Sequence, residues 1–446
     1  MSELRTIARH ASTVLVGQLA VMAFSVTDTI VAGRYSQDAL AALSVGAAVY
    51  VTVFVAFMGV LQALLPVWAE LHGARRHADV GRSVRQAVYL TLLGIALGAT
   101  ALLFPGTLLR LTEVPPELEK DVVRYLGVLV FALPAALFFR VYGTLNQALG
   151  HPRLVTLLQA MSLLVKIPLT VWFVFGGLGL QPQGAVGCAW ATVCVNWLMV
   201  LLAAWLLRTG RMYEPYAVWR KLEPPHWPTI WQFARLGIPG GLAVVVEVTS
   251  FTLMALFIAR QGATAAAAHQ IAANMAAVMY MVPLSLAIAT SARVSFWLGS
   301  GDPRQARRAA RTGFKVALGM ALAMCTAIAL ARSRIAGIYS PNPEVVAAAS
   351  GLIAWLAVFH FGDAVQGMCV FVLRCYRVVV APLVAYCVLL WGVGLAGGYV
   401  LAYVGMGPLA AQNSPHAFWQ AATVALVLAG PILAAILWRT ARAHRG

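Results

Sequence analysis

Three carboxylates lie inside apolar stretches long enough to cross a membrane. Asp28 falls in GQLAVMAFSVTDTIVAG, Glu247 in GGLAVVVEVTSFTLMALFIA and Asp363 in WLAVFHFGDAVQGMCVFVL. Inserting an ionised acid at the centre of a bilayer costs about 2.5 to 3.5 kcal/mol of free energy on insertion scales, so such residues are rare unless they have a function. Such acids typically mark an ion or substrate pathway. These three are therefore the first candidates for function.

The elements that carry the acids are predicted to be transmembrane helices. The chain has 446 residues, of which 61% are hydrophobic and 11% charged, with a mean hydropathy of +0.81, values typical of a membrane protein. Apolar runs of about 20 residues predict twelve spans. They lie near 11–33, 39–69, 86–105, 122–143, 154–176, 185–207, 229–259, 265–297, 313–331, 349–373, 381–404 and 418–438. We expect an all-α membrane protein rather than a β-barrel, because ten-residue alternating segments are almost missing.

The distribution of basic residues sets the expected orientation. Lys and Arg concentrate at 75–85, 208–221 and 304–315 and at both ends of the chain, whereas 177–184 and 405–416 carry no charge. The positive-inside rule then places both termini in the cytoplasm, which requires an even number of spans. This topology accounts for the formal charge of +17. We expect a multi-pass protein of the cell inner (plasma) membrane, with no nucleic-acid partner.

The chain also repeats. GQLAV at 17–21 and GGLAV at 240–244 open the first span of each half, and later matches recur at an offset of about 230 residues. We expect two six-helix bundles at 1–215 and 229–446, joined by a cytoplasmic linker at 216–228. Because six is even, the bundles share an orientation and are related by a pseudo-two-fold axis along the membrane normal. The linker region is rich in proline and tryptophan, and Trp219, Trp227 and Trp231 are expected at headgroup level.

Parallel repeats with acids at mid-membrane are typical of alternating-access transporters. No HExxH, GxSxG or Walker lysine occurs, so no enzymatic activity is expected and no ATP hydrolysis by this chain. An ion gradient must then supply the energy.

Several stretches resemble the multidrug and toxic compound extrusion (MATE) family over essentially the whole chain. The resemblance is carried by VTDTIVAGR, ALAALSVGAA, AAAAHQIAANMAAVMYMVPLSLAIATSARVSFWLGSG and GDAVQGM. It looks like the NorM branch, because Glu247 and Asp363 fall where that branch has acids. The resemblance implies a secondary antiporter that exports lipophilic cations in exchange for sodium ions or protons, with Asp28, Glu247 and Asp363 as the cation-coupling acids. Glu70, where the family often has Gln, and Leu373-Arg374-Cys375, in place of an LRG-like turn, depart from the pattern.

Depth along the helices separates the three acids. Glu247 precedes Arg260, at the outer end of its span, by thirteen residues, or about 20 Å. Asp363 follows Gly351, near the outer start of its span, by twelve residues, or about 18 Å. The two lie at nearly the same depth, whereas Asp28 is only about 8 Å from the outer end of its span.

Two facing carboxylates at one depth can share a proton near neutral pH and titrate as a unit. Alternatively, their oxygens and a hydroxyl such as that of Thr249 or Ser250 can hold a desolvated sodium ion. The sequence leaves sodium and proton open, with a sodium site at Glu247 and Asp363 as one outcome. No other cofactor is expected.

Six side chains are expected to contact the substrate: Phe251, Met254, Phe359, Gln366, Gln270 and Asn274. The first four share a helix face with Glu247 or Asp363, and a combination of acid, aromatic ring and methionine suits a lipophilic cation. The competing interpretation of each acid is a structural ion pair across helices, for which Arg140, Lys166 and Arg293 are the available partners.

The predicted function is a secondary multidrug exporter that acts as a monomer on small organic cations. A lipid-linked sugar flippase of the wider superfamily would need several arginines in its cavity, whereas acids predominate here. A major-facilitator-type drug transporter would carry a GxxxDRxGRR-type loop after its second span, which ELHGARRHADVGRSVRQ lacks. A channel is the third alternative, and measured counter-transport would separate it.

Overall fold

The protein is almost entirely helical. The computed structural model describes residues 3–106, 116–177, 179–405 and 410–443, and twelve helices in those ranges are long and apolar enough to cross a membrane. No β-strand occurs among the described residues, apart from one isolated bridge between Gly177 and Leu180. The predicted all-α membrane fold with twelve spans is confirmed.

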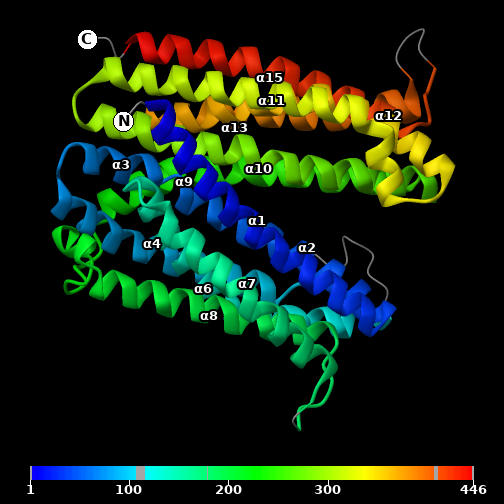
Figure 1. Ribbon diagram of the computed structural model, residues 1–446, viewed down its shortest axis with the longest axis horizontal. Coiled ribbons are helices and arrows are strands. Elements are labelled where there is room, and N and C mark those ends of the chain that lie inside the picture. The colour runs from blue at the N-terminus through cyan, green and yellow to red at the C-terminus, as the bar shows by residue number, and fades with distance from the viewer. Residues whose placement is uncertain (1–2, 107–115, 178, 406–409, 444–446) are drawn as a thin grey trace. The chain divides into compact units, whose positions relative to one another are not determined.

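Residues 13–241 form one compact unit, which we call the N-terminal unit. Among the described residues it contains most of α1 (Glu3–Tyr35) and the whole of six further α-helices. These are α2 (Gln37–Gln62), α3 (Leu65–Gly73), α4 (His77–Leu103), α6 (Pro116–Ala148), α7 (Pro152–Phe175) and α8 (Ala185–Thr209). Helix α6 is central, because α2, α4 and α8 all pack against it. Figure 1 shows these helices in blue to green.

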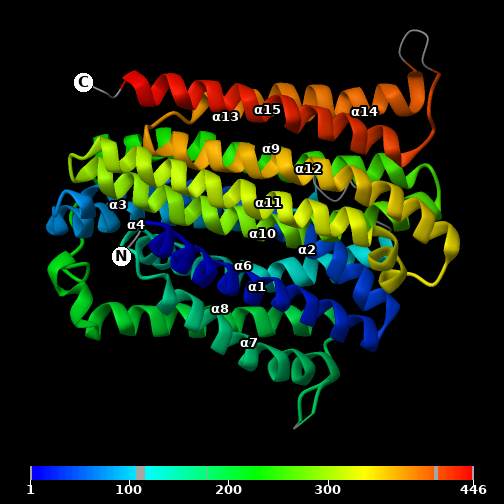
Figure 2. The same ribbon diagram turned by 45° about the horizontal axis from the view of Figure 1, so that its top comes forward.

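Residues 1–12 and 242–446 form the second compact unit, which we call the C-terminal unit. It contains α10 (Ala263–Gly299), α11 (Pro303–Tyr339), α12 (Pro343–Cys375), a span over 380–404 that combines α13 (Val380–Tyr386) and α14 (Gly397–Tyr399) with π-helical turns, and α15 (Pro415–Ala443). Helix α12 is central, because α10, α11 and α15 pack against it. Figure 2 shows α10, α11 and α12 running side by side.

Two helices are divided between the units. Helix α1 (Glu3–Tyr35) begins in the C-terminal unit, where Glu3 accepts hydrogen bonds from Arg293 Nη2 at 2.5 Å and from Trp297 Nε1 at 2.8 Å. Helix α9 (Trp227–Ala259) begins in the N-terminal unit. The sequence repeat predicts two homologous halves at 1–215 and 229–446 with a linker at 216–228. These boundaries remain a prediction.

Two glycines explain why the first half of α9 packs in the N-terminal unit. A Cβ atom added at Gly237 would lie 2.8 Å from the carbonyl oxygen of Val60, and one added at Gly241 would lie 2.6 Å from that of Ala56. Glycines four residues apart let helix backbones approach closely, as in small-xxx-small packing. The GIPGG segment therefore seats α9 directly against α2.

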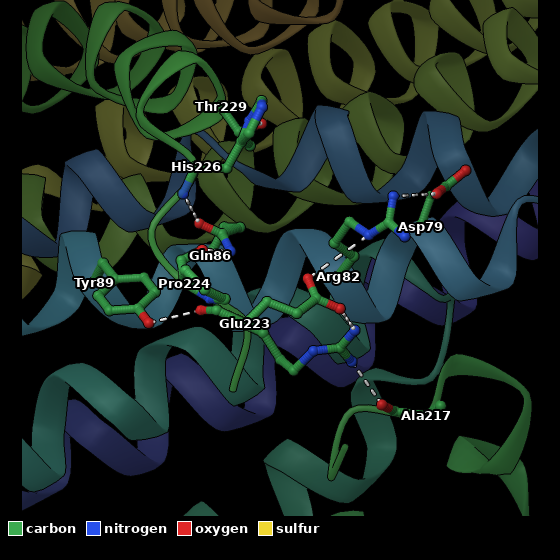
Figure 3. Close-up of polar contacts among 10 residues, drawn as sticks. Asp79, Arg82, Gln86, Tyr89, Ala217, Glu223, Pro224, His226 and Thr229 are labelled. Atoms are coloured by element: carbon green, nitrogen blue, oxygen red, sulfur yellow. Dashed lines mark hydrogen bonds and ion pairs between the residues drawn. The ribbon is translucent and has the colours of Figure 1, made fainter. Parts of the chain in front are cut away.

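The linker before α9 is held by side chains of α4 (Figure 3). Arg85 donates hydrogen bonds of 2.7 Å to the Ala217 carbonyl and to the Glu223 carboxylate. Tyr89 donates a third, also of 2.7 Å, to the backbone carbonyl of Glu223. The Arg85 side chain is only 7% exposed. The linker is thus a docked segment of the N-terminal unit and not a free tether.

The three tryptophans expected at headgroup level, Trp219, Trp227 and Trp231, are all exposed on the protein surface. Exposed indole rings near the ends of membrane helices suit the interfacial region.

Candidate functional site

Glu247 and Asp363 line one pocket in the C-terminal unit. Glu247 lies in the second half of α9 and Asp363 near the middle of α12. The pocket holds about 370 Å³ of empty space, part of which is open to solvent. Its lining also includes Ser250, Phe251, Met254, Phe359, Leu390, Gly394, Ala422, Ala425 and Leu426. Two residues 116 positions apart, as predicted from their equal depth, are brought to one cavity.

Asp363 is held in place by a short polar chain. The Gln366 side-chain amide donates a 2.9 Å hydrogen bond to Asp363 Oδ1. The Tyr386 hydroxyl, from the next span, donates to Gln366 Oε1. Gln366 is fully buried and does not line the pocket, so in this structure it orients Asp363. Its predicted contact with substrate is untested.

A buried cation interacts with Glu247. Arg374, in the last turn of α12, interacts electrostatically with Glu247 and stacks over the Phe371 ring at 4.7 Å. The hydroxyls of Tyr280 and Tyr386 also lie within electrostatic range of both acids.

Aromatic rings form one wall of the pocket. Phe251 lies 5.7 Å from Phe359, and both rings pack edge-on against Trp419 at 6.4 and 5.6 Å. Trp419 Nε1 donates a 3.2 Å hydrogen bond to His269 Nδ1, which fixes the indole. Ring edges and faces of this kind can contact an organic cation at the pocket surface.

The neighbours of Glu247 on its own helix have different environments. Ser250 and Met254 line the pocket, whereas the Thr249 hydroxyl donates to the carbonyl of Val245 at 2.6 Å. Of the two hydroxyls considered as sodium ligands, only that of Ser250 is available to the cavity.

Gln270 and Asn274 lie elsewhere. Both side chains are on the first half of α10, both are exposed, and neither lines this pocket. The structure does not bring them to the acids, and their predicted contact with substrate is untested.

Asp28 lies in the N-terminal unit and is engaged by Lys166 of α7. Lys166 Nζ lies 2.9 Å from Asp28 Oδ1 and 3.0 Å from Oδ2, and both side chains are buried. Thr170 donates a 3.3 Å hydrogen bond to the same carboxylate. Of the three basic residues considered as cross-helix partners, Lys166 is therefore the one seen to contact one of the three candidate acids. Arg293 pairs with Glu3, and Arg140 donates to the Met58 sulfur at 2.6 Å.

Within the described part of the chain, no cluster of three or more His, Cys, Asp and Glu side chains is arranged to hold a metal ion. The pocket itself offers two carboxylates, the Ser250 hydroxyl and two phenylalanine rings, groups that can contact a cation.

Comparison with known proteins agrees with this fold. The MatE family model matches residues 14–172 and 239–400. A probable multidrug resistance protein NorM from Aromatoleum aromaticum is 37% identical over 96% of this chain and 92% of its own length. The multidrug resistance protein PmpM of Pseudomonas aeruginosa is 34% identical over 99% and 92%. The crystal structure of a point mutant of the Vibrio cholerae MATE transporter VcmN superposes with a TM-score of 0.89 over 100% of this chain and 98% of that one, at 16% identity.

A multi-pass membrane transporter is the class that these features define. The chain belongs to the MatE family, as its sequence resemblance predicted.

Proposed function

We propose that this protein is a multidrug exporter that antiports lipophilic organic cations against sodium ions or protons by alternating access. The observation that carries the proposal is that Glu247 and Asp363 line the same pocket as Phe251, Met254 and Phe359. The relatives named multidrug resistance proteins support a role in drug export.

Coupling follows from the charge of the pocket. Of the described residues, two carboxylates and no basic side chain line the pocket, so it carries a negative charge that a bound cation would satisfy. A sodium ion, a proton and an organic cation then compete for it, and binding of one lowers the affinity for the others. Because a charge left unpaired in a low-dielectric interior is costly, the pocket favours an occupied state in every conformation that excludes water. This competition is the physical basis of exchange.

The apolar lining suits a lipophilic substrate. Phe251 and Phe359 present rings, and Met254 supplies an adaptable thioether that repacks around different shapes. The carboxylates select for positive charge and the rest of the lining is tolerant of shape. Acids, and not an arginine cluster, line the pocket, which favours drug cations over the anionic pyrophosphate of a lipid-linked sugar.

We further propose that the protein works as a monomer in the inner membrane, with both termini cytoplasmic. Helix α1 begins and helix α15 ends at the same end of the C-terminal unit in both views, as an even number of spans requires (Figures 1 and 2).

The proposal is tested by dye export from proteoliposomes that contain the purified protein, under an imposed sodium gradient or an imposed pH gradient, one at a time. One of the two gradients should drive accumulation of a fluorescent lipophilic cation, and Glu247→Gln or Asp363→Asn should abolish it. The matched control is Glu344→Gln, which removes an exposed acid from the first turn of α12. Gradient-driven transport that persists in both pocket variants would exclude these acids from coupling.

A further inference from the structure

The ammonium group of Lys166 is surrounded by oxygen atoms. Besides the two carboxylate oxygens of Asp28, it donates to Thr192 Oγ1 at 2.6 Å and to the carbonyl oxygen of Cys188 at 3.3 Å. The Lys166 side chain is 1% exposed. Four oxygens from two helices, α1 and α8, thus converge on a cation that a third helix, α7, supplies.

This oxygen set has the composition of a binding site for a monovalent metal ion. Hard cations take carboxylate, hydroxyl and backbone carbonyl oxygens, and each of these types is present. The Thr170 hydroxyl, which donates to Asp28 Oδ1 at 3.3 Å, is a further oxygen beside the carboxylate. A desolvated carboxylate of this kind needs a positive partner, and here the partner is covalently attached to the protein.

A cation that is part of the protein cannot act as the transported coupling ion. An ion that couples transport must enter from one side of the membrane and leave on the other. Lys166 cannot leave, and while it donates to Asp28 and Thr192, sodium and the ammonium would occupy the same position.

We propose that Asp28 forms a cation site that Lys166 fills permanently, so that the exchangeable sodium ion or proton is carried by the C-terminal unit alone. Lys166 is then the residue that determines which half of the protein binds the mobile ion. This inference extends the proposed function. Its test removes Glu247 and Asp363, so that the two proposals can fail separately.

The test measures equilibrium binding of radiolabelled sodium to purified protein at pH 8.5 in the Glu247→Gln/Asp363→Asn background. With Lys166 present, adding Asp28→Asn should not change the amount of sodium bound. Lys166→Gln, which replaces the ammonium with an amide oxygen donor, should gain one sodium ion per protein. Adding Asp28→Asn should remove that ion, and Lys166→Arg, which keeps the positive charge, should gain none.

Two results would overturn the proposal: no sodium gained by a folded Lys166→Gln protein, or sodium bound with Lys166 present and lost on Asp28→Asn. Thermal unfolding in choline chloride identifies which variants are folded. If Lys166→Gln does not fold, Asp28→Asn alone in the protein with both C-terminal acids decides. It should leave unchanged the number of sodium ions bound or, if none is bound, the number of protons released on dye binding, and the loss of one ion or proton contradicts the proposal.

Discussion

Gln366 donates a hydrogen bond of 2.9 Å to Asp363, three residues earlier on the same helix, and is itself held by Tyr386 from the following span. The carboxylate that we propose to bind the coupling ion is therefore oriented from behind, away from the pocket. Asp363 itself still lines the cavity, whereas Gln366 does not. A pocket acid that changes partners during transport gains from such a support, because its position need not be established anew with each ion.

Removing the support should weaken coupling without removing the charge. Tyr386→Phe deletes the hydroxyl that holds Gln366, a loss of about 1 kcal/mol, which corresponds to roughly fivefold in apparent affinity for the driving ion. The affinity is measured from dye transport in proteoliposomes at a series of ion concentrations. The control is Tyr403→Phe, which removes a hydroxyl that donates to the Phe257 carbonyl outside the pocket. Equal effects of the two substitutions would show that only general stability is affected.

The aromatic wall should set the affinity for flat cationic dyes. Phe359→Leu keeps the pocket apolar but removes the ring beside Phe251 and Trp419, which should raise the dye concentration for half-maximal transport about three- to tenfold. The maximal rate with a small aliphatic ammonium substrate should change little. Phe361→Leu, two residues along the same helix and exposed, is the control. A loss of all substrates to the same degree would argue for a packing role.

Close packing of α9 on α2 predicts a stability effect. Gly241→Ala places a methyl group within 2.6 Å of the Ala56 carbonyl oxygen, so α9 must move, at a cost of about 1 to 3 kcal/mol. Gly319→Ala, on α11, meets no atom within 4 Å and should be neutral or slightly stabilising. The midpoint of thermal unfolding in detergent compares the two. An unchanged midpoint for Gly241→Ala would rule out the close contact.

The docked linker predicts a difference in proteolysis. Arg85→Met removes both hydrogen bonds to the linker and should speed tryptic cleavage after Arg220 or Lys221 by roughly tenfold, because the segment opens more often. Arg82→Met removes an exposed partner of Glu223 at 3.6 Å and should leave the rate nearly unchanged, since exposed ion pairs contribute little. Cleavage at the same rate in both variants would mean that Arg85 does not hold the linker.

Much of the fold was predictable from the sequence because membrane helices are marked by length and hydropathy. The twelve spans and the shared depth of Glu247 and Asp363 follow from counting residues along helices of known rise. Helical spacing also placed Phe251 and Met254 beside Glu247. Phe251 and Met254 lie on the same helix as Glu247, so residue spacing alone determines that relationship.

Counting residues along each helix could not predict which side chains contact one another across helices. Tyr386 supports Gln366 from the next span, and Trp419 packs on the aromatic rings of the pocket from α15. Lys166 was only one of three basic residues available to a buried acid. Which side of each helix faces its neighbour depends on packing across several spans. A buried polar residue in an apolar span is the signal that would have found them, since such residues need partners.

Competition in binding tests the central claim most directly. A fluorescent lipophilic cation is titrated into purified protein at increasing sodium concentration at fixed pH, and at decreasing pH without sodium, with choline chloride keeping ionic strength constant. The account predicts that one of these ions raises the apparent dissociation constant in proportion to its concentration, and that this dependence disappears in Glu247→Gln/Asp363→Asn. Dye binding that neither ion affects in the wild-type protein would contradict it.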